Sequence, residues 1–213
     1  WDKLQKLVLG GDGQEMELRS LARRGKDQKW FMVKATLAKE KIEGSLQDVT
    51  EKVKANDRLH FLAEHDPLTG ILNRRGIEKE FDEAVAMLGD GVSMSLAYLD
   101  LDRFKLINDL FGHLAGDEVL KQVCERVRNM LTEGQSMGRV GGDEFVIVFK
   151  GTPIDSAAWV CRGIVDRIGN LPYQIGDRAF QVKGSIGLME ISESIRVKDA
   201  ISVADRACRE AKS

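Results

Sequence analysis

Two acidic segments of the sequence carry the residue types that nucleotide chemistry requires. In the first, the largely apolar strand predicted over Met94–Leu101 ends with two carboxylates, Asp100 and Asp102, and Lys105 follows. The second is the tetrapeptide Gly-Gly-Asp-Glu at 141–144, which separates two runs of strand-forming residues. A Gly-Gly pair permits the positive φ of a tight turn and lets a large ligand approach the backbone. Two carboxylates with few other ligands suit Mg²⁺, which takes its remaining oxygens from water and substrate phosphates.

The two acidic segments converge if their strands are neighbours in one sheet. Alternation along the first strand places Leu96, Tyr98 and Asp100 on one face, and strand ends of α/β sheets are where ligands bind. Asp100 and Asp143 together would hold a metal ion that activates a 3′-hydroxyl and neutralises charge at an α-phosphorus. Lys105 and loop N–H groups would then meet the phosphates. The pattern alone leaves open the alternative that these aspartates are solvated turn or cap residues.

The elements expected around these segments alternate between helix and strand. Apolar residues at helical spacing predict helices over 77–88, 119–131, 157–168 and 197–211. Runs of strand formers predict strands over 94–101, 137–140 and 145–149, and a strand pair or one long bent strand within 180–191. The order helix, strand, helix, hairpin, helix, strand, helix predicts an α/β domain with one mixed sheet flanked by helices.

The amino-terminal part has a different pattern. Residues 15–22 and 30–38 predict two antiparallel strands joined by the polar connection 23–28, with a third short strand within 41–47. Three strands are near the minimum for independent stability, so this segment is expected to need a partner surface. From Asp48 the spacing becomes helical, with Asp48 or Thr50 as N-cap. This helix either pairs with its own copy or is a plain amphipathic linker.

Composition narrows the class of protein. The chain has 213 residues, a formal net charge of -2 and 43% hydrophobic residues, enough for one domain plus a smaller piece. Near-neutral charge gives no electrostatic case for binding nucleic acid or a membrane surface, and no apolar run reaches the roughly 18 residues that span a bilayer. The 3 cysteines are expected to be reduced apolar fillers in a cytoplasmic protein. Because the chain begins with Trp1, we expect it to be a segment of a longer protein.

Five motifs, in order, resemble those of the GGDEF family of diguanylate cyclases. The most specific is the signature itself, RVGGDEF, which this chain carries with the arginine that usually precedes it. The others resemble the family's opening motif, its metal-and-guanine segment, a late strand and the last helix. The five stand at Arg139–Phe145, His65–Arg75, Asp100–Leu120, Ser185–Gly187 and Ala204–Lys212. The resemblance covers residues 65 to 213 and implies a mixed sheet of the palm or nucleotidyl-cyclase type.

The resemblance implies a metal site and a catalytic set. Asp100 and Asp143 would bind Mg²⁺ or Mn²⁺ together with the Leu101 carbonyl. Glu144 would be a second carboxylate at the metal or the proton acceptor, and the sequence does not decide between these roles. Asp143, Glu144 and Lys105 would form the catalytic set.

The resemblance also implies a GTP site. Phe104 and Lys105 would hold phosphates largely through backbone N–H groups, and Lys212 would reach the terminal phosphates. Asn108 and Asp117 would read guanine, because a carboxylate accepts from both N1–H and the 2-amino group. Leaving that acceptor unpaired costs a few kcal/mol, enough to reject ATP. The full set implied for GTP is Phe104, Lys105, Asn108, Asp117, Gly141, Gly142 and Lys212.

The family reaction joins two GTP molecules into cyclic di-GMP and releases two pyrophosphates. Each half-site binds one GTP, so two domains must face one another antiparallel and a homodimer is part of the mechanism. Two other readings stay open. The domain could bind GTP without chemistry beside an EAL-type phosphodiesterase domain, or it could be a dimerisation module with a relic site.

Two departures from the family pattern matter. Thr132, Glu133, Gly134 and Gln135 stand where the family has the R-x-x-D of its product-inhibition site, so we predict that this inhibitory site is lost. The family also continues to a G-R-N whose arginine binds phosphates, whereas this chain ends at Ser213. We therefore expect a carboxy-terminal truncation that lowers activity.

The amino-terminal piece resembles the closing strands of a PAS sensor domain. The resemblance rests on the turn and strand at Arg24–Phe31 and on Asp48-Val49-Thr50, after which such proteins begin a signalling helix. It implies a division into a partial PAS-like domain at 1–47, a signalling or linker helix at 48–65 and a GGDEF domain at 66–213. Only the second half of a PAS fold would be present, so its ligand pocket would be incomplete.

Overall fold

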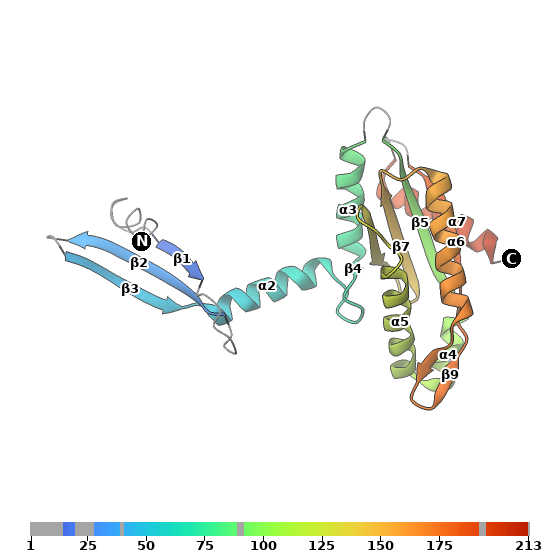
Figure 1. The fold of residues 1–213 in the computed structure, drawn as a ribbon, viewed down its shortest axis with the longest axis horizontal. Coiled ribbons are helices and arrows are strands. Elements are labelled where there is room, and N and C mark those ends of the chain that lie inside the picture. The colour runs from blue at the N-terminus through green and yellow to red at the C-terminus, as the bar shows by residue number, and fades with distance from the viewer. Residues whose placement is uncertain (1–14, 20–27, 39–40, 89–91, 192–194, 213) are drawn as a thin grey trace. The chain divides into compact units, whose positions relative to one another are not determined.

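The computed structural model describes residues 15–19, 28–38, 41–88, 92–191 and 195–212 (Figure 1). Its contacts divide the chain into two compact units, Trp1–Phe61 and Leu62–Ser213. The boundary lies within one helix, α2 (Thr50–Glu64).

The first unit is a three-stranded antiparallel sheet. Strand β2 (Trp30–Ala38) lies between β1 (Glu15–Arg19) and β3 (Lys41–Asp48), as the strand-forming runs predict. The predicted continuation of the first strand over 20–22 lies outside the described residues, and so does most of the connection 23–28.

A short polar cluster joins β3 to α2. The Asp48 carboxylate accepts from the Thr50 N–H at 3.0 Å and from its hydroxyl at 2.5 Å, and these bonds lower the pKa of Asp48 to about 2. The Thr50 hydroxyl in turn accepts from the Trp30 N–H at 2.9 Å. The residues proposed as alternative caps, Asp48 and Thr50, therefore act together at this helix start.

The second unit is built on a five-stranded sheet of order β10-β5-β7-β6-β4. The pairs are antiparallel except β4 with β6, so the sheet is mixed, as predicted. The strands are β4 (Leu72–Asn73), β5 (Met94–Asp102), β6 (Gln135–Arg139), β7 (Glu144–Lys150) and β10 (Lys183–Glu190). The central strands β5 and β7 are almost wholly buried, because helices cover both faces.

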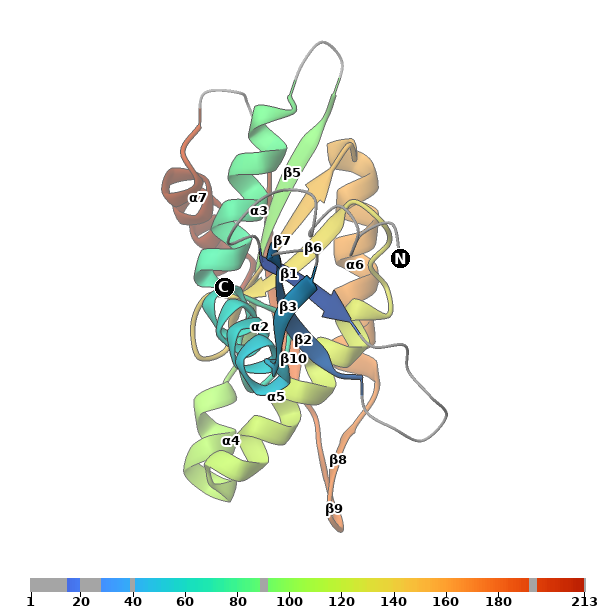
Figure 2. The same cartoon turned by 90° about the vertical axis from the view of Figure 1, so that its left-hand side faces the viewer.

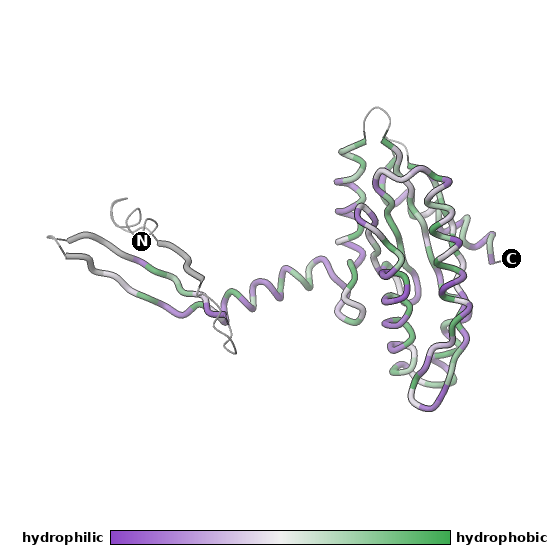
Figure 3. Tube along the Cα trace, viewed as in Figure 1, coloured by the Kyte–Doolittle hydropathy of each residue, from purple (hydrophilic) through white to green (hydrophobic). Residues whose placement is uncertain are grey.

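Alternation along the strands divides the core into two layers. Leu96 and Tyr98 pack toward the helices α3 (Arg74–Ala86) and α7 (Val197–Ala211). Ala97 and Leu99 pack in the other layer, against α5 (His113–Arg128) and α6 (Ile154–Asn170). Figure 2 shows α3 with α7 and α5 with α6 on opposite sides of the sheet, and Figure 3 shows hydrophobic and hydrophilic residues alternating along these helices.

Two elements at one end of the sheet were not foreseen from the sequence. A short helix, α4 (Phe104–Phe111), follows β5 and packs on α5, and the hairpin β8 (Tyr173–Ile175) and β9 (Arg178–Phe180) lies near it. The rings of Phe111 and Phe180 meet edge to face, with centroids 4.6 Å apart. Gly112, at φ 83°, separates α4 from α5, and α5 begins at His113, ahead of the start that the sequence predicted at 119.

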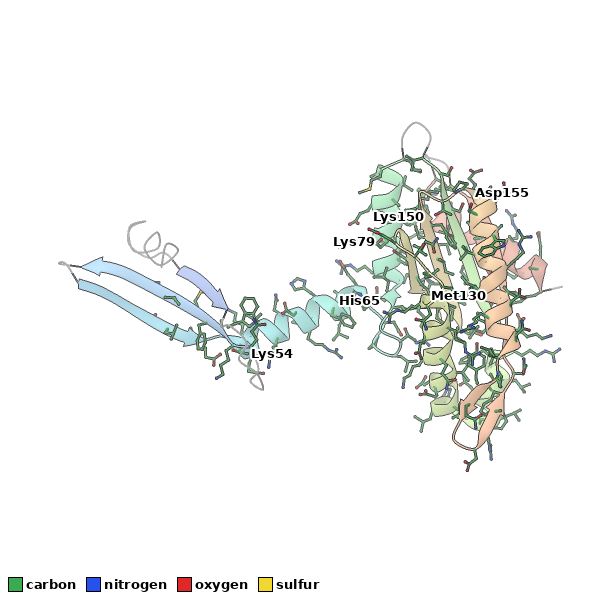
Figure 4. All side chains as sticks on the ribbon, in the orientation of Figure 1. Lys54, His65, Lys79, Met130, Lys150 and Asp155 are labelled. Atoms are coloured by element: carbon green, nitrogen blue, oxygen red, sulfur yellow. The ribbon has the colours of Figure 1, made fainter. Side chains whose placement is uncertain are left out.

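Salt bridges fasten α3 to its surroundings. Lys150 at the end of β7 meets Glu80 at 2.6 Å, and Lys79 meets Glu64 of α2 at 2.8 Å; both lysines are labelled in Figure 4. Asn73 caps α3 by accepting from the Gly76 N–H at 2.9 Å. The Asn73 amide also donates to the carbonyls of Ala63 and His65, at 3.2 and 3.3 Å, and thus bonds the end of α2 as well as the start of α3.

Candidate active site

The end of β5 and the β6–β7 turn are joined by backbone bonds. The Leu101 N–H donates to the Asp143 carbonyl at 3.2 Å, and the Val140 N–H closes the turn on the Glu144 carbonyl at 2.9 Å. Asp100 lies opposite Glu144 in the β5–β7 register. The two acidic segments therefore meet at one sheet end, as the sequence predicts for neighbouring strands.

The carboxylates gathered here repel one another. Burial raises the pKa of the Asp143 carboxyl above its usual value, and the charges of Asp100 and Glu144 raise it further. Burial and the neighbouring Glu144 also raise the pKa of the Tyr98 hydroxyl. The turn thus concentrates negative charge that a cation would relieve.

The donor set fits a magnesium ion that shares its ligands with a nucleotide. The carboxylates of Asp100 and Asp143 are hard oxygen donors close enough for the charge of one to raise the pKa of the other, and the Leu101 backbone is bonded to that of Asp143. Within the described ranges, no three His, Cys, Asp or Glu side chains converge as a complete metal-binding group. An ion held here would need oxygens from another source, and phosphates are the usual one for Mg²⁺.

Lys212 already neutralises part of this charge. Its ammonium lies 2.5 Å from the Asp100 carboxylate and 3.4 Å from that of Asp102, whose oxygens also accept from the Ser185 hydroxyl at 3.0 Å. Burial opposes the charge, but hydrogen bonds and attraction from Asp100 and Asp102 raise the pKa of Lys212 above its usual value. The structure therefore places Lys212 on the acidic cluster, and the contact with terminal phosphates that the resemblance implies for it stays a prediction.

The glycine pair forms the turn without the positive φ that glycine permits. Neither Gly141 nor Gly142 has a positive φ, so the turn does not need a left-handed residue there. A Cβ on Gly141 would collide with the Glu144 carboxylate, which folds back over this position. A Cβ on Gly142 would meet open space. Close approach of Glu144 is therefore what requires Gly141, the positive φ that the pair permits is not used, and the approach of a ligand to this backbone stays a prediction.

Arg139 stabilises the β6–β7 turn through side-chain hydrogen bonds. Its Nε and Nη2 donate to the Gly142 carbonyl at 3.1 and 2.8 Å, and its Nη1 donates to Asp66 at 3.2 Å. Asp66 also accepts from the N–H and hydroxyl of Thr69, at 2.9 and 2.6 Å. Arg74 adds a bond to the Val140 carbonyl at 2.7 Å. The sequence showed these residues only as motif members, because no pattern tells which distant carbonyl an arginine will meet.

We expect Arg139→Lys to destabilise this turn. A lysine cannot make the forked contact with Gly142 and Asp66 at once, so about 1–3 kcal/mol of unfolding free energy should be lost. For a domain of this size that is a fall of about 2–4 °C in Tm per kcal/mol, measurable by circular dichroism. Arg162→Lys is the matched control, because Arg162 is exposed and, among the described residues, donates to Ala158 within its own helix. Equal Tm values for the two variants would contradict a stabilising role of the Arg139 hydrogen bonds.

The start of α4 adjoins the acidic cluster. Arg103, the residue before α4, has a left-handed φ of 56°, and among the described residues it alone does so without being glycine. Phe104 is buried at 5% exposure, whereas Lys105 is exposed. The first N–H groups of a helix have no partner within it and favour anions. The positions expected to hold phosphates therefore lie at a suitable helix end.

The two residues expected to read guanine are also close together. Asn108 lies on α4 and Asp117 on α5, and the two helices pack on one another. A Cβ on Gly116 would collide with the Asn108 amide oxygen, so the Asn108 side chain lies against the residue next to Asp117. Both side chains are half-buried. They can therefore face a single flat ligand from one side.

This fold and site define a class of protein: a nucleotidyl-cyclase-like domain, with a mixed sheet between helices and an acidic hairpin beside an acidic strand end. Residues 63–213 match the family described as "Diguanylate cyclase, GGDEF domain". The chain belongs to the GGDEF family.

Known relatives agree with this assignment. The chain is 31% identical over 170 residues to the "Probable diguanylate cyclase DgcE" of Escherichia coli, covering 79% of this chain and 15% of that protein. It is 35% identical over 140 residues to the "Bifunctional diguanylate cyclase/cyclic di-GMP phosphodiesterase MucR" of Pseudomonas aeruginosa, covering 65% of this chain and 20% of that protein. The chain thus spans about a fifth or less of the length of these relatives.

Among solved structures, the diguanylate cyclase SiaD from Pseudomonas aeruginosa, crystallised with its activator SiaC, has a similar fold. The TM-score is 0.66 at 32% identity, covering 76% of this chain and 64% of that one. None of the helices within the described ranges has the length and apolarity that a bilayer crossing requires.

Proposed function

We propose that this GGDEF domain is a diguanylate cyclase, which condenses two GTP molecules into cyclic di-GMP with release of two pyrophosphates. The observation that carries the proposal is the meeting of Asp100 with Asp143 and Glu144 beside the start of α4. Carboxylates for a metal and free helix N–H groups for phosphates are the parts that nucleotidyl transfer needs.

The acidic cluster would hold Mg²⁺ or Mn²⁺ through Asp100, Asp143 and the Leu101 carbonyl. When bound, the ion would lower the pKa of a 3′-hydroxyl and offset charge on the phosphates. Glu144, folded over Gly141, is placed either to join the metal or to accept the proton.

The nucleotide would lie across the start of α4. Phosphates would meet the N–H groups of Phe104 and Lys105, and guanine would face Asn108 and Asp117. Asp117 gives the preference for GTP over ATP, because adenine lacks the paired donors that its carboxylate accepts. Each domain would hold one GTP, so an antiparallel homodimer completes the reaction.

We also propose that the amino-terminal sheet is the closing part of a PAS-like sensor, at 1–47, and that residues 48–65 form a signalling helix. The direct connection from β3 into α2 through Asp48 and Thr50 supports this division. Leu59 and Leu62 of α2 are 66% and 38% exposed, and so are open to a partner helix. We place the domain in the cytoplasm, where GTP is available.

The test is direct. Protein incubated with GTP and Mg²⁺ is analysed by anion-exchange chromatography for cyclic di-GMP. Formation of the product confirms the cyclase. Binding of GTP without product would favour the second function, a silent GTP-binding domain beside an EAL-type phosphodiesterase domain, which the bifunctional name of the relative MucR makes the main alternative.

We expect no product inhibition through an R-x-x-D site. Thr132 and Gln135 close a small turn before β6, with the Thr132 N–H donating to the Gln135 side chain at 3.0 Å, and no arginine stands at either position. Initial rates measured at rising cyclic di-GMP should therefore stay constant. Arg128, one turn back on α5, lines a nearby cavity and is the residue to exchange for alanine if inhibition is seen.

A further inference from the structure

A groove runs from the acidic cluster along α4. It has a volume of about 720 Å³. Phe111 and Phe180, whose rings meet, line its apolar part, and its end next to the acidic cluster is polar. The polar residues at that end are Asp102, Arg103, Lys183 and Lys212.

The register of the sheet brings Lys183 to this end. Lys183, the first residue of β10, lies directly opposite Asp102 of β5. Residues paired in this way present their side chains on the same face. Ser185, two residues further along β10, confirms the face because its hydroxyl donates to Asp102. Lys183 is therefore on the side of the sheet where Asp100, Asp102 and Lys212 meet.

Two of the positively charged side chains at this end of the groove have no acidic partner among the described residues. Lys212 is engaged by Asp100 and Asp102, at 2.5 and 3.4 Å. Arg103 and Lys183 are exposed, and neither has a salt bridge or side-chain hydrogen bond with any residue that the structure describes. Two uncommitted cations therefore line the end of the groove next to the start of α4, where helix N–H groups also favour an anion.

We propose that Lys183 and Arg103 form a phosphate-binding subsite that holds the terminal phosphates of the bound nucleotide and inorganic pyrophosphate. The inference rests on the proposed function and deepens it, because it adds two side chains to the phosphate contacts expected of Lys105 and Lys212. The ligand is a di- or triphosphate, since two separate cations, Arg103 before α4 and Lys183 at the start of β10, match several adjacent negative groups better than one. Guanine lies outside this subsite, against Asn108 and Asp117.

The test compares pyrophosphate with GMP. Isothermal titration calorimetry with Mg²⁺ should show that Lys183→Gln weakens binding of inorganic pyrophosphate and of GTP about 10-fold, the worth of one charge-assisted hydrogen bond. Affinity for GMP, which has no terminal phosphates, should change less than 2-fold. Adding Arg103→Gln should weaken pyrophosphate further, again without an effect on GMP.

Lys198→Gln is the matched control, because it removes the same charge from an exposed position on α7 away from the groove. If Lys183→Gln weakens GMP as much as pyrophosphate, or no more than the control weakens pyrophosphate, the subsite is wrong. If the unaltered protein binds GTP and the Lys183→Gln variant binds it equally well, the proposed subsite is wrong but the proposed function is not affected. If the unaltered protein binds neither GTP nor pyrophosphate, the proposed function falls with it.

Discussion

Asp143→Ala is expected to abolish formation of cyclic di-GMP, with a rate at least about 1,000-fold lower. The substitution removes one of the two carboxylates that would hold the metal, and the charge stabilisation supplied by a bound metal is worth several kcal/mol. GTP affinity should fall much less, because in the proposed site guanine and the terminal phosphates would meet other residues. Product is measured by anion-exchange chromatography, and GTP binding by calorimetry. Asp177→Ala, in the exposed β8–β9 turn, is the control.

The same position offers a check that does not depend on activity. Because the pKa of Asp143 is raised in the folded protein, its ionised form destabilises the fold without metal. The protonated Asp143 carboxyl contributes its whole share of the unfolding free energy below the ordinary carboxyl pKa. That contribution is lost as the pH rises through the raised pKa of the folded protein. Metal-free Asp143→Asn should therefore have a higher Tm than the unaltered protein at pH 7, and the difference should vanish as pH falls toward 4. A lower Tm at pH 7 would contradict the crowding of carboxylates at the turn.

Lys212→Met is expected to have opposite effects on metal and on nucleotide. The Lys212 ammonium is paired with Asp100 and Asp102, so a divalent ion bound by these carboxylates would have to displace it. Removing the charge should tighten binding of Mn²⁺ alone about 10-fold, as measured by electron paramagnetic resonance of free Mn²⁺. It should also lower kcat/KM for GTP about 10- to 100-fold, if Lys212 moves to the phosphates once the metal has arrived.

Lys121→Met is the control for this variant, because the salt bridge of Lys121 among the described residues is with Glu118, at 3.6 Å on the same helix, α5. The control should leave both quantities unchanged. Weaker Mn²⁺ binding by Lys212→Met would show that the lysine supports the metal site instead of competing with it. Tighter Mn²⁺ binding with unchanged kcat/KM would limit Lys212 to the acidic cluster and remove it from the phosphate contacts.

Much of the site could be predicted from the sequence, because its motifs are local. The apolar strand ending at Asp100 predicted β5 and its buried face, and the Gly-Gly-Asp-Glu segment predicted a hairpin turn between β6 and β7. Such features depend on the hydrophobic periodicity and the residue types of a short local segment, which the sequence shows directly. The family was identified from the same local segments, and the match over residues 63–213 confirms it.

Long-range contacts could not be predicted in this way. No periodicity shows that Arg139 reaches Asp66, that Asn73 bonds the end of α2, or that Lys212 reaches Asp100 across 112 positions. The short β4 was missed because two residues are too few to show a periodic pattern. Helix α4 was missed because it ends before Gly112 after only 8 residues, which is too short for a clear helical period.

The sequence by itself determined the long helices and strands, the order of the motifs and the chemistry that these residue types allow. The tertiary structure alone decided which charges meet. It placed Lys212 on two carboxylates, folded Glu144 over Gly141, and aligned Lys183 with Asp102 through the β5–β10 register. The physical reason is that secondary structure follows from interactions between near neighbours along the chain, whereas the partners of a charge depend on how distant strands and helices pack.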